Sequence, residues 1–165
     1  MTQSSFEHTA QLSTEDLIFH IYEQHHRQER EWAEELSVLA NRVLLAHYAH
    51  GKETVLMLHR NISLLKMELE ALFAKEEKEL FRLLRKGANG PDEQNIIRKH
   101  ILARKEDQER IQRMFAETSE KTDGFTPPPF ACATMAAMYE KLGRLADDFS
   151  QHTALENDVL YARFQ

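Results

Sequence analysis

The amino-acid sequence predicts an all-α protein, an antiparallel up-down-up-down bundle of four long helices. Glycine and proline are scarce, with 5 and 4 among 165 residues, and 29% of the residues are charged. This composition favours long helices over sheet. Apolar residues also recur every three or four positions, which is the spacing of a helix with one buried face. With 42% hydrophobic residues, the chain is long enough for one domain with a sizeable core.

The four helices are expected between clear start and stop signals. They would cover residues 14–49, 53–86, 92–122 and a final stretch from about 130 to 164. Ser13 and Asp16 form a plausible capping box before the first helix. Gly51 separates the first helix from the second, and the glycine-rich residues 87–91 separate the second from the third. The three prolines at 127–129 cannot all be helical, so they precede the last helix.

The remaining features limit the organisation and the partners of the protein. Residues 1–12 are expected to form a disordered N-terminal arm, and residues 13–165 the bundle domain. The net charge of −6 argues against nucleic acid or an anionic membrane as a general partner. No run approaches 18 apolar residues, so no membrane-spanning helix is expected. The single cysteine, Cys132, fits a reducing compartment, and we expect a cytoplasmic protein. Exposed Phe and Met residues could form the interface of a homodimer.

A histidine and a glutamate interrupt the apolar face of the last helix. His152 and Glu156 are four residues apart, so both project from one side. Leu145, Phe149 and Val159 lie on the same face. A charge buried there is costly unless it is paired or bound to a metal. An imidazole and a carboxylate in register suit iron, manganese or zinc, and a buried His–Glu hydrogen bond is the alternative.

Other polar residues fall at the same depth of the predicted bundle. They occupy inward positions near the start of the first helix, the end of the second and the start of the third. These residues are His25 or His26, Glu76 and His100. At about 1.5 Å per residue, their depths agree with those of His152 and Glu156 to within roughly two turns. Three histidines and two carboxylates converging in a bundle core are typical of carboxylate-bridged metal sites. The alternative is a polar network that has lost its metal.

The first helix offers two adjacent histidines. Its apolar stripe, with Ile18 and Trp32, places His25 inward. Adjacent helical residues point about 100° apart, so only one of His25 and His26 should bind a metal. His47 lies roughly 31 Å further along a straight helix and is too distant to share the site.

Several segments add a family resemblance. They are Thr126-Pro-Pro-Pro-Phe-Ala-Cys-Ala-Thr, Ala137-Met-Tyr, Asp147-Asp and His152-x-x-Leu-Glu-Asn-x-Val-Leu-x-x-Arg163, with shorter matches at His26-x-x-x-Arg-Glu and Lys75-Glu-Glu-x-x-Leu-Phe. Together, over roughly residues 17–164, they resemble the C-terminal part of the repair-of-iron-centres proteins. These are hemerythrin-like (HHE) di-iron proteins.

The resemblance implies a hemerythrin-like four-helix bundle that holds non-haem iron. The bridging carboxylates of the family correspond to Glu76 and Glu156, and three of its histidine ligands to His26, His100 and His152. The motif match thus favours the second histidine of the first-helix pair. These five residues form the predicted metal site.

One departure from the family pattern concerns the second helix. The family carries HxxxE there, mirroring the fourth helix, whereas this chain has Leu72 four residues before Glu76. Leucine cannot coordinate a metal, so one iron would lose an imidazole. The consequence would be weaker binding, an open position or a mononuclear site, so the expected cofactor is one or two irons per chain.

The resemblance implies a function in protecting or repairing iron–sulfur centres under oxidative or nitrosative stress. Damaged iron–sulfur proteins would then be its partners. One alternative is a sensor or carrier that binds O₂ or NO at iron. Another is a degenerate, metal-free bundle acting as an interaction module. Without a GxSxG motif, a phosphate-binding glycine loop or a catalytic cysteine context, a hydrolase or nucleophilic enzyme has little support. We favour an iron-binding repair or stress protein over a turnover enzyme.

Overall fold

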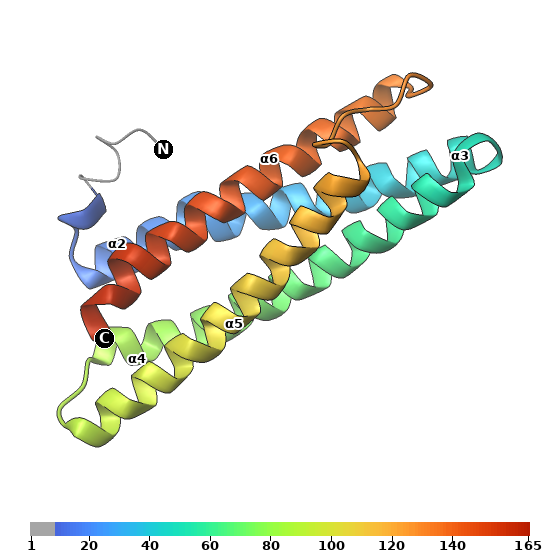
Figure 1. Ribbon diagram of the computed structural model, residues 1–165. Coiled ribbons are helices and arrows are strands. Elements are labelled where there is room, and N and C mark those ends of the chain that lie inside the picture. Colours follow the sequence, from blue (N-terminus) through green and yellow to red (C-terminus); the bar gives the residue numbers. More distant parts are fainter. Residues whose placement is uncertain (1–8) are drawn as a thin grey trace.

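The computed structural model describes residues 9–165, and this part of the chain is helical without strands (Figure 1). The α-helices are α2 (Thr14–Ile21), α3 (Arg27–Lys75), α4 (Phe81–Lys86), α5 (Pro91–Lys121) and α6 (Ala133–Leu155). Three π-helical turns, η1 (Tyr22–His26), η2 (Glu76–Leu80) and η3 (Glu156–Leu160), and a 3-10 turn, η4 (Tyr161–Phe164), join or extend them.

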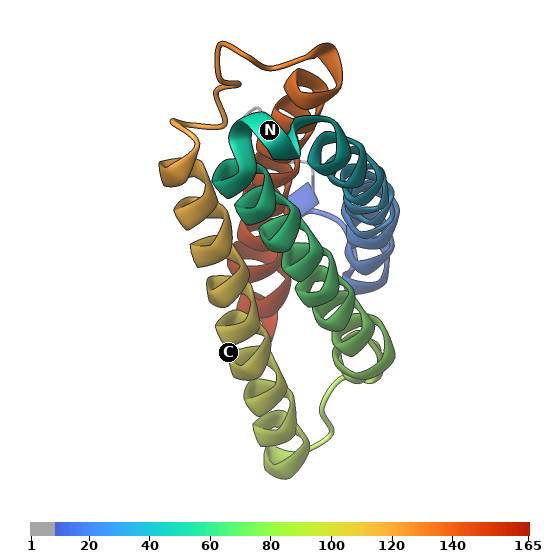
Figure 2. The ribbon, with the colours of Figure 1, turned by 90° about the vertical axis from the view of Figure 1, so that its right-hand side faces the viewer.

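These elements form four antiparallel rods, which confirms the predicted bundle (Figures 1 and 2). The helix α3 supplies parts of two rods, because it turns back at Gly51, where the backbone leaves the helical region with φ −151° and ψ 38°. Arg30 and Glu70 form an ion pair across the two arms. Lys66 and Glu34 form another. The turn at Gly51 and the α5–α6 connection lie at one end of the bundle, and α2, α4 and the C-terminus lie at the other (Figure 1).

The predicted boundary signals act as expected. The Ser13 hydroxyl oxygen accepts a hydrogen bond from the Asp16 N–H at 3.1 Å and caps α2. Gly87 ends α4 with φ +70°, a conformation that favours glycine. Of the arm predicted over residues 1–12, residues 1–8 lie outside the described residues, whereas Thr9 is buried and Leu12 packs against the core.

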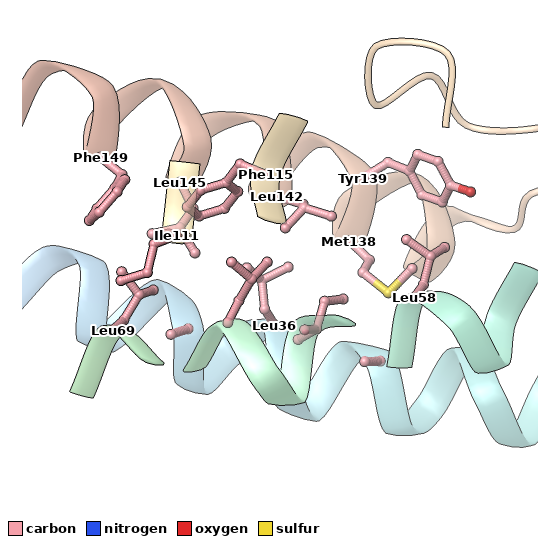
Figure 3. Packing of buried hydrophobic residues seen from close by; sticks show 14 of the residues in the cluster. Leu36, Leu58, Leu69, Ile111, Phe115, Met138, Tyr139, Leu142, Leu145 and Phe149 are labelled. Atoms are coloured by element: carbon pink, nitrogen blue, oxygen red, sulfur yellow. The ribbon is translucent and has the colours of Figure 1, made fainter. Parts of the chain in front are cut away.

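Two apolar clusters fill the bundle. The large apolar cluster lies toward the Gly51 end, where the α6 side chains face those of α3 and α5 (Figure 3). Its members include Leu36, Leu69, Leu72, Phe73, Ile111, Phe115, Leu142, Leu145 and Phe149. The small apolar cluster lies at the end that holds α2 and α4. Its members include Leu17, Ile21, Leu80, Phe81, Ile97, Ile101, Leu155 and Leu160.

A buried polar layer separates the two clusters along every rod. On the second rod, Glu76 follows Phe73 of the large cluster and precedes Leu80 of the small one. On the fourth rod, His152 lies between Phe149 and Leu155 in the same way. The residues predicted to bind a metal therefore lie in a shared cross-section of the bundle, apart from the exception described below. No helix in the described part combines the length and apolarity that crossing a lipid bilayer requires.

Candidate metal centre

Three of the four rods contain a π-helical turn, which has one residue more than an α-helical turn, where they meet the polar layer. In η1, the Arg27 N–H donates to the carbonyl of Tyr22, five residues earlier. The η2 and η3 turns contain the same i→i+5 bond, which the carbonyls of Glu76 and Glu156 accept. Single π turns within α-helices are frequent at functional sites, because the extra residue redirects the side chains around it.

The π turn in the first rod brings both adjacent histidines into the core. His25 is 4% exposed and His26 is fully buried. The imidazole of His152 lies beside both rings, with ring centres 5.2 Å from His25 and 4.8 Å from His26. The sequence predicts that only one of the pair binds a metal. The π turn buries both rings, and only His26 joins the group of ligands described next.

Four fully buried side chains converge in the polar layer. They are His26, Glu76, His152 and Glu156, and one nitrogen or oxygen of each lies within 4.8 Å of the others. The two Nε2 atoms are 3.2 Å apart. His26 Nε2 is 3.4 Å from Glu76 Oε2, and His152 Nε2 is 3.5 Å from Glu156 Oε2. Three of the four rods contribute to this set.

The opposite nitrogen of each ring is held by a further carboxylate. His26 Nδ1 donates to Glu77 Oε1 at 2.9 Å, and His152 Nδ1 donates to Glu29 Oε1 at 3.0 Å. In the neutral imidazole, a proton on Nδ1 leaves Nε2 as a lone pair. Both Nε2 lone pairs then face the same point between the two rings. This is the tautomer and orientation that a metal-binding histidine requires, with the outer carboxylates as its supporting partners.

The two carboxylates keep oxygen atoms free toward the same region. Glu76 Oε2 and Glu156 Oε1 are buried and accept no hydrogen bond from any residue of the described chain. Their other oxygens accept hydrogen bonds from the amide of Gln108, at 3.4 Å to Glu76 Oε1 and 2.6 Å to Glu156 Oε2. The Tyr161 hydroxyl also donates to Glu76 Oε1 at 3.1 Å. Unpartnered buried oxygens are costly, and a divalent cation would satisfy both while balancing two negative charges.

Without a metal, the buried acidic and imidazole groups of this site have shifted pKa values. Burial, reinforced by the nearby Glu156 charge, raises the pKa of Glu76 to about 7. Burial lowers the pKa of the His152 imidazole, but Glu29 and Glu156 outweigh it, so the pKa lies well above its usual value. The pKa of His26 is likewise raised, because the nearby carboxylates of Glu76 and Glu77 outweigh its burial. Protons on these groups would therefore have to leave when a metal cation binds.

Comparison with known proteins assigns the family. Residues 17–164 match the hemerythrin HHE cation-binding domain. The chain belongs to this family. It is also 31% identical over 152 residues to proteins named iron-sulfur cluster repair protein YtfE, from Escherichia coli O1:K1 / APEC, E. coli SMS-3-5 and Escherichia fergusonii. The alignment covers 90% of this chain and 64% of each relative, so the chain spans about two thirds of their length.

The structure does not bring His100, the fifth predicted ligand, to this hemerythrin-like site. Its half-exposed ring faces Glu79 on the surface, with Nδ1 3.8 Å from Glu79 Oε2. The residue of α5 that enters the polar layer is Gln108, eight positions and about 12 Å further along the helix. The prediction failed because the polar middle of α5 hid which face is buried.

Leu72, which stands where the family has the histidine of its HxxxE motif, packs as a core residue. Leu72, one turn before Glu76, is buried in the large apolar cluster. The side of the hemerythrin-like site formed by the second and third rods thus presents Leu72 and the amide of Gln108 where imidazoles would be needed. The donors that remain, two imidazoles and two carboxylates, fit one cation rather than a di-iron pair.

Several residues of the site were not predicted from the sequence. Gln108 and Tyr161 bind the carboxylates, and Glu29 and Glu77 hold the imidazoles. Glu29 follows His25 at the same four-residue spacing that separates His152 from Glu156. This second His–Glu pair is the sequence pattern that could have predicted Glu29. The contacts of Gln108 and Tyr161 depend on the three-dimensional arrangement and leave no such pattern.

Proposed function

We propose that the chain is a non-haem iron-binding protein that serves in the repair of iron–sulfur centres. The observation that carries the proposal is the pair of Nε2 atoms 3.2 Å apart, flanked by unpartnered oxygens of Glu76 and Glu156. His26, Glu76, His152 and Glu156 would hold one iron. The mixed imidazole and carboxylate set suits ferrous iron among the available divalent cations.

The residues around these ligands would prepare the site. The carboxylates of Glu77 and Glu29 fix the imidazoles, and the Gln108 amide spans the two glutamates. The rings of Phe73 and Phe81 stack on His26, at 4.4 and 5.6 Å between ring centres, and shield it from water. When bound, iron would supply redox and Lewis-acid chemistry at this buried position.

Two features support release of iron rather than permanent storage. The third rod offers only a neutral amide, so the set has fewer anionic and imidazole donors than a di-iron site. The Glu76 carboxyl, with a pKa of about 7, retains a proton that competes with the cation near neutral pH. We infer that the iron is labile and is donated to damaged iron–sulfur proteins in the cytoplasm, which agrees with the repair function in the name of the relatives.

Iron content after anaerobic loading and desalting tests the site. The Glu156→Gln variant should hold one iron fewer than the parent, whereas Asp158→Asn, an exposed carboxylate in the same turn, should hold as much as the parent. Equal iron in the parent and in Glu156→Gln would refute the proposed ligands.

Transfer of the iron tests the biological function. Supplied with inorganic sulfide and a thiol reductant, an apo-form iron–sulfur acceptor should take iron from the loaded protein and regain the absorbance of its cluster. A reversible spectral change with O₂ or NO and no iron loss to the acceptor would instead indicate a sensor or carrier.

A further inference from the structure

A second group of potential ligands lies against the first site. His25, Glu29 and Asp148 place one nitrogen or oxygen each within 4.8 Å of one another. His25 Nδ1 is 2.9 Å from Asp148 Oδ2, and a carboxylate oxygen of Glu29 lies within 4.8 Å of one of Asp148. Two carboxylates this close repel each other, and a bound cation would relieve the repulsion.

Two atoms of this group are buried without a partner. Glu29 Oε1 accepts the His152 hydrogen bond, whereas Glu29 Oε2 has no hydrogen bond to any described residue. His25 Nε2 is likewise without a partner in the described part of the chain. Fixing the His152 ring requires one oxygen only. The second Glu29 oxygen, the His25 ring and the Asp148 carboxylate therefore exceed what support of the first site needs.

The charge of the group is also uncompensated. In the described structure, Glu29 and Asp148 form ion pairs with the rings of His152 and His25 only, and with no lysine or arginine. A buried carboxylate beside a partly buried one, with no permanent cation to pair with either, is unfavourable, and a divalent ion would balance both charges. The Asp148 side chain is 22% exposed, which leaves this group a route to solvent.

We propose that His25, Glu29 and Asp148 form a second binding site for a divalent first-row transition-metal ion. The site lies where η1, the start of α3 and α6 meet, next to His152. One imidazole and two carboxylates suit ferrous iron, manganese or zinc. The proposal goes beyond the one-iron site and does not depend on it: the second ion would lie between the first and fourth rods, whereas Leu72 and Gln108 belong to the second and third.

Cobalt(II) titration followed by its visible absorption, with metal analysis after dialysis, tests this site. The parent protein should bind two equivalents. Asp148→Asn should bind one, with at least a tenfold weaker affinity for the other. Asp147→Asn, its exposed neighbour, should still bind two, and Glu156→Gln should keep the one held by the second site. If circular dichroism shows that Asp148→Asn does not fold, His25→Gln provides the same test.

The outcomes separate the two sites. One equivalent in the parent that Glu156→Gln removes and Asp148→Asn leaves intact would overturn the second site and leave the one-iron site standing. One equivalent that only Asp148→Asn removes would support the second site and overturn the first. No bound cobalt in the parent would overturn both.

Discussion

The two imidazoles of the first site differ in the carboxylate behind them. Glu77, the partner of His26, also accepts a hydrogen bond from Arg30 at 2.8 Å and is 24% exposed. Glu29, the partner of His152, is fully buried. A carboxylate that shares its charge with a guanidinium polarises an imidazole less than one that does not. His152 should therefore be the stronger donor to a cation, and His26 the one that releases it first.

Restoring imidazoles on the second and third rods should add one bound iron. In the Leu72→His/Gln108→His variant, the new rings would face Glu76 and Glu156, because Leu72 lies one turn before Glu76 and the Gln108 amide is 2.6 Å from Glu156 Oε2. Iron analysis after anaerobic loading measures the gain. Leu72→His alone should lower the unfolding free energy without adding iron, since it inserts a polar ring into the large apolar cluster. An iron content unchanged from the parent in the double variant would contradict this prediction.

The single cysteine should be reactive near neutral pH. Cys132 is exposed at the start of α6, and a hydrogen bond with His47 Nε2 at 3.1 Å, together with backbone N–H groups of the helix, lowers the thiol pKa to about 7. Iodoacetamide labelling should accelerate as the pH rises through about 7. His47→Ala should shift this midpoint upward by removing the largest cause. An identical pH profile in the variant would exclude the pairing with His47.

At the scale of elements, the helices were predictable and their π turns were not. Boundaries at Ser13, Gly51 and Gly87 follow from local chemistry, since each position caps, bends or ends a helix by its own side chain or lack of one. A π turn inserts a single residue into an otherwise regular helix and has no composition of its own. The sequence therefore indicated four of the residues in the first site but not that both His25 and His26 are buried.

The inner face of α5 was obscured for a different reason. Arg104 and Asp107 are buried although charged, because they pair with each other at 3.0 Å. Lys75 and Arg110 also pair with Asp107, at 2.9 and 2.7 Å. A buried ion pair breaks the apolar periodicity on which helix-face prediction depends, and this is why His100 was assigned to the inside in place of Gln108.

The ion pairs that Asp107 forms with Lys75, Arg104 and Arg110 should be the main electrostatic interaction that holds α5 against α3. Asp107→Ala would leave Arg104 buried without its closest partner, which should cost about 2 kcal/mol of unfolding free energy, less than for a pair without solvent contact. Urea denaturation measures the loss, and the exposed Glu106→Ala provides the comparison. Iron content should stay at the parent level, because no ligand contacts Asp107. A loss equal to that of Glu106→Ala would show that the network contributes little.

At the scale of the whole molecule, the metal-free protein should lose stability as the pH rises from about 5 to 7.5. Folding raises the pKa of Glu76 from its ordinary value to about 7, so the folded state holds a proton that the unfolded chain has already lost in this range. The raised pKa values of His26 and His152 act in the same direction above their ordinary range. Denaturation in the presence of a chelator measures this slope, and Glu76→Gln should reduce it.

Bound metal should reverse this trend, because it replaces the proton on Glu76. At a free metal concentration of a hundred times the dissociation constant, binding should stabilise the fold by about 2.7 kcal/mol. The midpoint of thermal unfolding should then rise with metal and return to its original value with chelator.

A metal-free protein that gains stability between pH 5 and 7.5 would contradict the upward direction of the Glu76 pKa shift.

The division of the core into two apolar clusters has a consequence for how the molecule opens. A layer of polar and charged side chains separates the two clusters, so without metal we expect the half containing α2 and α4 to detach while the half around Gly51 stays packed. Amides of α2 and α4 should then exchange with solvent faster than those in the middle of α6, and metal should bring the two rates together. Iron would leave by partial unfolding of one end of the bundle, and the rate of donation would be set by how often that end opens.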